Sequence, residues 1–181
     1  MPAFIKGGIV LMAPKAEPIV SVVMGSDSDL PIMEESTKIL EQFGIPYELF
    51  LTSAHRSPAR TTTFAKNAAH RGIKVIIVGA GAAAHLAGVI ASETLLPVIG
   101  VPVDATSLRG LDALLATVQM PGGIPVATMA IGKAGARNAA LFAVRILALE
   151  NETMQNNLIK FVDNMAKDVA IKHENLMGIR S

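Results

Sequence analysis

The chain contains no cysteine and no tryptophan, and only 17% of its 181 residues are charged. The lack of cysteine excludes disulfides, thiolate metal sites and cysteine nucleophiles. Lysine and arginine number 16 against 15 aspartates and glutamates, so the formal net charge of +1 is too small to attract a polyanion, and no dense basic run is present. We therefore expect no nucleic-acid binding. The sequence also lacks an HExxH motif, a P-loop lysine and a carboxylate cluster, which leaves a metal site without support.

Apolar residues, by contrast, make up 51% of the chain. A helix that spans a lipid bilayer needs about 20 continuous apolar residues. The two windows without charged residues, 75–92 and 113–132, are interrupted by Gly79-Ala80-Gly81 and by Pro121 to Pro125. Residues 1–17 lack the long apolar stretch and the small-residue cleavage site of a secretory signal. We expect no membrane association, but a soluble, cytoplasmic homo-oligomer whose extra apolar surface faces other subunits.

Short β-rich runs alternate with helical patterns from residue 18 onward. We expect strands over 19–24, 47–51, 74–78, 97–101 and 125–129, and helices over 30–43, 58–72, 83–94, 111–118, 135–149 and 152–175. This alternation predicts an α/β fold of three layers, α/β/α, with a mostly parallel five-stranded, flavodoxin-like sheet. The predicted organisation is a flexible extension (1–17), a catalytic domain (18–150), and an amphipathic C-terminal helix and tail (151–181). We expect this last segment to pack on the domain or on a neighbouring subunit.

The first loop at a predicted strand end is Gly25-Ser26-Asp27-Ser28-Asp29. Ligands of open parallel sheets bind at the carboxyl ends of strands. Ser26 and the N–H groups of the following helix start are suited to phosphate oxygens, and Asp29 is suited to sugar hydroxyls. Plain N-capping is the alternative interpretation, because Ser and Asp are preferred at helix starts.

The second loop is Ser53-Ala54-His55-Arg56-Ser57-Pro58, in which Ser57 and Pro58 form a typical helix start. Arg56, with serines on either side, has the forked donor geometry that grips a phosphate. Histidine exchanges a proton near neutral pH, so His55 is a candidate general acid and base. The alternative is a solvated surface pair.

The third loop is Gly79-Ala80-Gly81-Ala82-Ala83-Ala84-His85. Its small side chains leave room for a flat ring, and His85 is either a second polar contact or a helix-start histidine. The loop also matches a dinucleotide fingerprint, since Asp104 follows Ala84 by 20 residues. An NAD(P)-dependent oxidoreductase that uses Gly79 to Ala84 is therefore the alternative function. Against it, two polar loops precede this one and His55 would have no role.

Taken together, five motifs resemble the 5-(carboxyamino)imidazole ribonucleotide mutase family, the catalytic subunit of bacterial-type phosphoribosylaminoimidazole carboxylase. In chain order they are residues 24–29, 53–58, 79–86, 119–126 and 130–135, and the resemblance covers residues 18–150. It implies an isomerase of IMP biosynthesis that moves a carboxylate from the exocyclic nitrogen of an aminoimidazole ribonucleotide to ring carbon four. It further implies a homo-octamer without metal or organic cofactor, with an ATP-dependent synthetase as a possible partner.

The resemblance also assigns roles to individual residues. His55 matches the family's general acid and base. The substrate contacts that it implies are Ser26 and Asp29 for phosphate and ribose, Ser53 and Arg56 for phosphate, and Gly81, His85 and Leu86 around the imidazole and carboxylate. Relatives that use CO2 directly typically carry Lys after the Ser-Ala-His, so Arg56 favours the mutase type. One departure is Gly122, where some members carry Arg. A non-catalytic nucleotide-sensing module is the third possibility.

Overall fold

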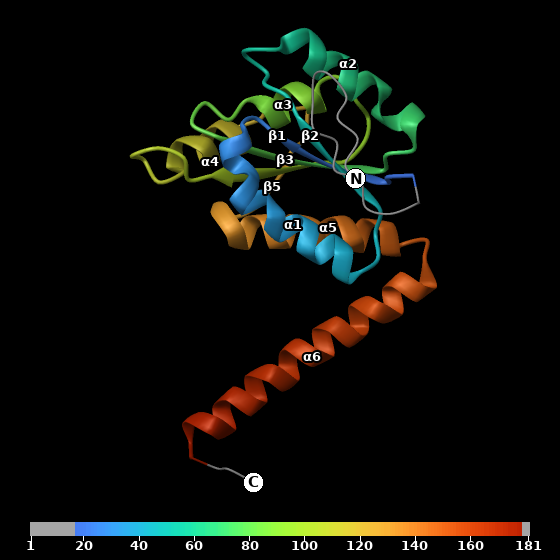
Figure 1. Ribbon diagram of the computed structural model, residues 1–181, viewed down its shortest axis with the longest axis vertical. Helices are drawn as coiled ribbons and strands as arrows, with labels where there is room; N and C mark the ends of the chain where they lie inside the picture. The colour runs from blue at the N-terminus through green and yellow to red at the C-terminus, as the bar shows by residue number, and fades with distance from the viewer. Residues whose placement is uncertain (1–16, 179–181) are drawn as a thin grey trace, which may run out of the picture. The chain divides into compact units, whose positions relative to one another are not determined.

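The computed structural model describes residues 17–178, and Figure 1 shows how its helices and strands are arranged. Contacts within the chain divide it into two compact units, Met1–Ala143 and Val144–Ser181. The first unit holds the entire sheet. The second holds the end of α5 (Gly132–Ala148) and the whole of α6 (Glu152–Leu176). Apart from Glu17, the N-terminal extension expected from the sequence lies outside the described residues.

The sheet has five parallel strands in the order β2-β1-β3-β4-β5. The strands are β1 (Val20–Met24), β2 (Tyr47–Leu51), β3 (Val75–Gly81), β4 (Val98–Val103) and β5 (Ala127–Thr128). Apart from Gly81, every residue of the three central strands is buried, which is why their sequences are almost continuously apolar. The predicted α/β fold with a flavodoxin-like sheet is confirmed.

Helices cover both faces of this sheet (Figure 1). On one side lie α2 (Pro58–Ala68), which continues as a 3-10 turn over Ala69–Arg71, and α3 (Leu86–Ala91). On the other lie α1 (Leu30–Gln42) and the part of α5 within the first unit. A further helix, α4 (Leu111–Val118), packs on β4, as its many contacts with that strand indicate. Across residues 17–178, none of the helices has the length and apolar character that a membrane crossing needs.

The third loop begins later in the chain than predicted, so Gly79, the first glycine of the dinucleotide fingerprint, is not part of it. β3 runs on to Gly81 rather than ending at Val78, because β4 also continues and pairs Gly81 with Val103. Gly79 therefore lies inside a strand, where an added Cβ would be 2.4 Å from the sulfur of Met33. This glycine makes room for a core methionine. α3 is correspondingly shorter than the predicted 83–94.

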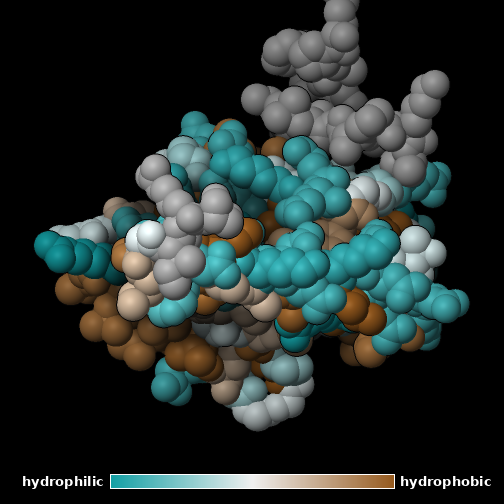
Figure 2. Space-filling model, turned by 90° about the horizontal axis from the view of Figure 1, so that it is seen from below, coloured by the Kyte–Doolittle hydropathy of each residue, from teal (hydrophilic) through white to brown (hydrophobic). Residues whose placement is uncertain are grey.

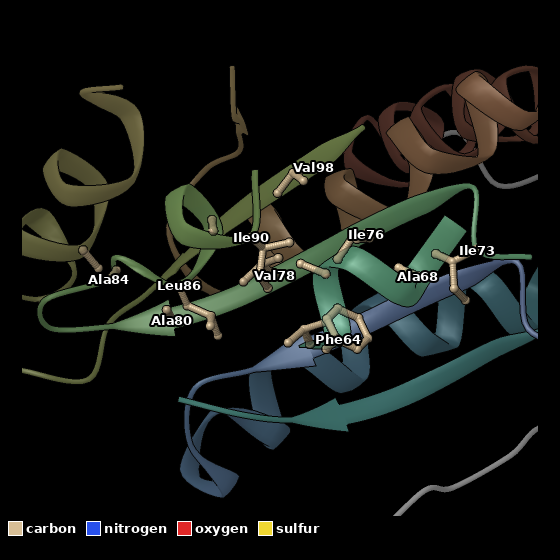
Figure 3. Close-up of a cluster of buried hydrophobic side chains, with 14 residues drawn as sticks. Phe64, Ala68, Ile73, Ile76, Val78, Ala80, Ala84, Leu86, Ile90 and Val98 are labelled. Carbon is tan, nitrogen blue, oxygen red and sulfur yellow. The ribbon is translucent and has the colours of Figure 1, made fainter. Parts of the chain in front are cut away.

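The core beneath α2 and α3 is a cluster of buried apolar side chains (Figure 3). Phe64 and Ala68 of α2 and Ile90 of α3 lie against Ile76 and Val78 of β3. Burial of such side chains contributes about 1.5–3 kcal/mol each for the larger ones. Ala80 and Leu86 also belong to this cluster, so the packed core reaches the carboxyl end of β3.

Large apolar side chains also reach the surface. Figure 2 shows one face of the molecule, with hydrophobic residues gathered toward the lower left of the view among hydrophilic ones. Within the first unit, the exposed large apolar side chains include Leu95, Leu108, Leu111, Leu115 and Val118. Leu111, Leu115 and Val118 lie in α4, at spacings that put them on one stripe of the helix, and Leu108 lies in the turn before it.

Candidate functional site

Three loops that follow β1, β2 and β3 line a single cavity of about 360 Å³. All the site residues expected from the sequence line this cavity except His85. His85 does not line it but contacts His55, which does. The lining residues are Gly25, Ser26, Ser28, Asp29, Ser53, Ala54, His55, Arg56, Ala80, Gly81, Ala82, Ala83, Leu86 and Ala105. Parallel strands bring the loops together because their carboxyl ends all meet at one edge of the sheet.

The first loop contains a 3-10 turn, Asp27–Asp29, with a capping box in which Ser26 and Asp29 take part. The Asp29 carboxylate accepts a hydrogen bond from the Ser26 N–H at 3.0 Å, and the Ser26 hydroxyl accepts one from the Ser28 N–H at 3.3 Å. The N-capping interpretation is thus confirmed, and both side chains line the cavity as well. Asp29 is only 3% exposed. Burial raises the pKa of its carboxyl group, against the opposing effect of hydrogen bonds from the Ser26 and Gly25 N–H groups.

The second and third loops meet through two histidines. Nε2 of His55 lies 2.9 Å from Nδ1 of His85, and the two rings are nearly perpendicular, at 81°. A hydrogen bond between two ring nitrogens needs one protonated and one unprotonated atom. Of the two facing nitrogens, one therefore donates its N–H and the other accepts it with its lone pair. Both side chains are exposed to solvent at the cavity rim.

Arg56 joins the second loop to the first. Its Nη2 donates to the Gly25 carbonyl oxygen at 3.4 Å, and its backbone N–H donates to the Ser53 hydroxyl at 3.1 Å. Its side chain is exposed, as the surface-pair interpretation requires, yet it lies against the same cavity as Ser26. This arrangement places a cation with several free donors where an anionic ligand can reach it.

The third loop lies close to a fourth loop, the one that follows β4 and contains Ala105. A Cβ added to Gly81 would be 2.6 Å from the Ala105 Cβ and 3.3 Å from the Val103 carbonyl oxygen, so only glycine fits there without movement. The next residue, Ala82, has a positive φ of 53°, a conformation that costs energy for any residue with a Cβ. Sequence reasoning missed Ala105. The signal for it was its place just after β4, at the same sheet edge.

The side chains at this site combine one buried carboxylate, one guanidinium, two imidazoles and several hydroxyls. Such a set can hold an anionic, hydroxyl-bearing ligand and transfer protons to it. Over residues 17–178, no three His, Asp or Glu side chains are grouped so that they could hold a metal ion.

Comparisons with known proteins identify the family of the chain. The AIR carboxylase family matches residues 19–168. The N5-carboxyaminoimidazole ribonucleotide mutase of Pyrococcus horikoshii is 52% identical over 168 residues, which cover 93% of this chain and 94% of the relative. The mutase of the same name from Thermotoga maritima is 51% identical, over 90% and 94% of the two chains. The crystal structure of Treponema denticola PurE superimposes with a TM-score of 0.78 and 28% identity, and covers 87% of this chain and 97% of that one. With this agreement in sequence, fold and extent, the chain belongs to the AIR carboxylase family.

Proposed function

We propose that this protein is an N5-carboxyaminoimidazole ribonucleotide mutase of purine biosynthesis. It converts 5-carboxyamino-1-(5-phosphoribosyl)imidazole to 5-amino-1-(5-phosphoribosyl)imidazole-4-carboxylate. The relatives that bear this name share about half of their residues with this chain over nearly their full lengths. The observation that carries the proposal is the convergence of three strand-end loops, with His55 and Arg56, on one cavity.

The substrate's parts match different sections of the cavity lining. The phosphate binds to Arg56 with the Ser26 and Ser53 hydroxyls, because a guanidinium and neutral donors together suit a dianion. Asp29 accepts hydrogen bonds from ribose hydroxyls. The flat imidazole lies against Gly81 and Leu86, where no larger side chain intrudes.

His55 is the general acid and base. As the bond between the exocyclic nitrogen and the carboxylate carbon breaks, the imidazolium of His55 gives its proton to that nitrogen, and CO2 and a neutral aminoimidazole result. Ring carbon four then attacks CO2 and forms the new C–C bond. The proton on that carbon returns to His55, so the enzyme ends in its starting state and the reaction is an isomerisation. Close confinement by the small side chains around Gly81 keeps CO2 beside the ring.

His85 completes the site as the partner of His55. In the free enzyme the two rings hold each other through one N–H. Substrate enters by replacing that contact, and His85 then hydrogen-bonds the migrating carboxylate. His55 is released toward the exocyclic nitrogen.

The test is conversion of the N-carboxylated ribonucleotide, followed by ultraviolet absorbance, in His55→Asn. General acid–base catalysis contributes about 10²- to 10⁴-fold, so we expect turnover to fall by that amount. His70→Asn is the matched control, because His70 is exposed and lies outside the cavity lining. Near-normal turnover in His55→Asn would refute the mechanism. Binding of the ribonucleotide without turnover in the unaltered protein would indicate the nucleotide-sensing module. Saturable NADH binding that is unchanged by substitution of Arg56 would indicate the oxidoreductase.

We further propose a cytoplasmic homo-oligomer, an octamer, served by an ATP-dependent synthetase that supplies the substrate. The exposed apolar side chains of Leu108, Leu111, Leu115 and Val118 support an assembly, since a monomer would leave them in water. In α6, Val162, Met165 and Val169 are likewise exposed. We assign the C-terminal segment 151–181 to contacts in that assembly. A monomeric mass by light scattering at micromolar concentration would contradict it.

A further inference from the structure

The chain around His55 has no helix or strand of its own. β2 ends at Leu51 and α2 begins at Pro58, and Ala54 to Arg56 form a turn between them. No ladder of backbone hydrogen bonds holds the turn, so its position depends on what ties its two ends together. Ala54 packs against the apolar core, and the two ends of the turn are tied together by hydroxyl groups and one backbone hydrogen bond.

Ser57 closes the turn. Its hydroxyl accepts a hydrogen bond from the Ser53 N–H at 3.0 Å and donates one to the Ser53 carbonyl oxygen at 3.1 Å. The Ser57 N–H donates to the same carbonyl at 2.9 Å. Although Ser57 occupies the cap position of α2, its side chain makes no bond to a helix N–H, contrary to the expectation from the sequence. The hydroxyl is therefore committed to the turn and not to the helix.

Two buried threonines stand behind Ser57. Thr52 Oγ1 is 3.2 Å from Ser57 Oγ and 2.9 Å from Thr61 Oγ1. Thr61 is 0% and Thr52 3% exposed, so no solvent competes for these groups. Each hydroxyl has one proton to donate. Since the Ser57 hydroxyl donates to Ser53, Thr52 is the donor in its contact with Ser57. The Thr61 hydroxyl lies within hydrogen-bond distance of Thr52 Oγ1, at 2.9 Å, and of the Ser57 carbonyl oxygen, at 3.3 Å.

We propose that Ser57, backed by Thr52 and Thr61, is a positioning residue that holds the His55 turn in its reactive place. This rests on the proposed mutase function. The chain of hydroxyls links the end of β2 and the first turn of α2 to the carbonyl of Ser53, two residues before His55. Buried hydrogen-bond chains of this kind reinforce one another and resist displacement.

The first test compares Ser57→Ala with Ser57→Thr, which keeps the hydroxyl. A misplacement of about 1 Å at a reacting group costs up to about 100-fold in rate, so we expect kcat to fall about 10- to 100-fold in Ser57→Ala with a smaller change in KM. Ser57→Thr restores kcat. The control is Ser36→Ala, which removes a buried hydroxyl that donates to the Ala136 carbonyl oxygen at 2.7 Å, away from the turn.

The second test reads the position of His55 without turnover. The chain has only 4 histidines, so their ring signals can be assigned by nuclear magnetic resonance with His55→Asn as the reference. In the free enzyme, the signals of His55 and His85 shift in Ser57→Ala, because their contact at 2.9 Å is disturbed, and return in Ser57→Thr. Ser36→Ala leaves both signals in place.

A third variant guards against misfolding. Thr61→Val keeps the shape of the side chain and removes the Thr61 hydroxyl with its contacts to Thr52 Oγ1 and the Ser57 carbonyl oxygen, and we expect a several-fold loss of kcat with the same histidine signals affected. The proposal is overturned if Ser57→Ala or Thr61→Val matches Ser36→Ala in both kcat and histidine signals. A failure of the proposed mutase function gives a different result, because the unaltered protein would then lack turnover. The ring signals of His55 and His85 would still show whether Ser57 holds the His55 turn in position.

Discussion

Gly81→Ala tests how closely the third and fourth loops approach. The new Cβ would lie 2.6 Å from the Ala105 Cβ, where about 3.4 to 4 Å is ordinary contact, so one of the two strand ends must move by about 1 Å. Overpacking of this kind costs about 1–3 kcal/mol, and the loss of glycine's freedom in the unfolded chain returns about 0.4–1 kcal/mol. We expect a net destabilisation of about 1–2 kcal/mol.

The measurement is urea unfolding followed by circular dichroism at one fixed protein concentration, because an oligomer's stability depends on concentration. Gly122→Ala is the control, since nothing lies within 4 Å of its added Cβ and its φ is not in the left-handed region. The double variant Gly81→Ala with Ala105→Gly removes the clashing atom and should recover most of the loss. An unchanged midpoint in Gly81→Ala, or no recovery in the double variant, would refute the reasoning.

Two further predictions concern pH. Tyr47 is the chain's single tyrosine, and burial together with its bond to Glu41 raises its pKa to about 12. Its absorbance near 295 nm should therefore titrate near pH 12 in the folded protein and near 10 after unfolding. The stability that this group contributes is present below pH 10 and lost as pH rises through about 12. Coincident midpoints would contradict the burial. For Asp29, burial raises the carboxyl pKa, so its contribution to stability is present below the ordinary aspartate pKa of 3.8 and falls as pH rises through the raised pKa of the folded protein. Asn cannot ionise and still offers an oxygen acceptor to the Ser26 N–H, so Asp29→Asn should lack this fall and be at least as stable as the unaltered protein at pH 7, while the KM for the ribonucleotide rises. A large loss of thermal stability at pH 7 would contradict this.

The alternation of apolar runs and helix signals was enough to predict the fold class. α4 begins and ends where the sequence indicates, at Leu111 and Val118, because its pattern is local. β3 was predicted too short because its last residues, Ala80 and Gly81, are strand only through pairing with Pro102 and Val103 of β4. A pairing between residues so far apart in the chain leaves no mark in a local pattern.

The sequence by itself determined which residues are available for chemistry and the order in which they occur. Ser26, His55 and Arg56 stand directly after apolar strands, and parallel strands bring such positions to one edge. Only the tertiary structure decided that His85 faces His55 at 2.9 Å, that Gly81 must stay bare beside Ala105, and that the Ser57 hydroxyl turns back to Ser53 instead of capping its helix. The reason is physical: each of these depends on distances between separate loops or on one rotamer of one side chain, and those are set by packing that no single stretch of sequence contains.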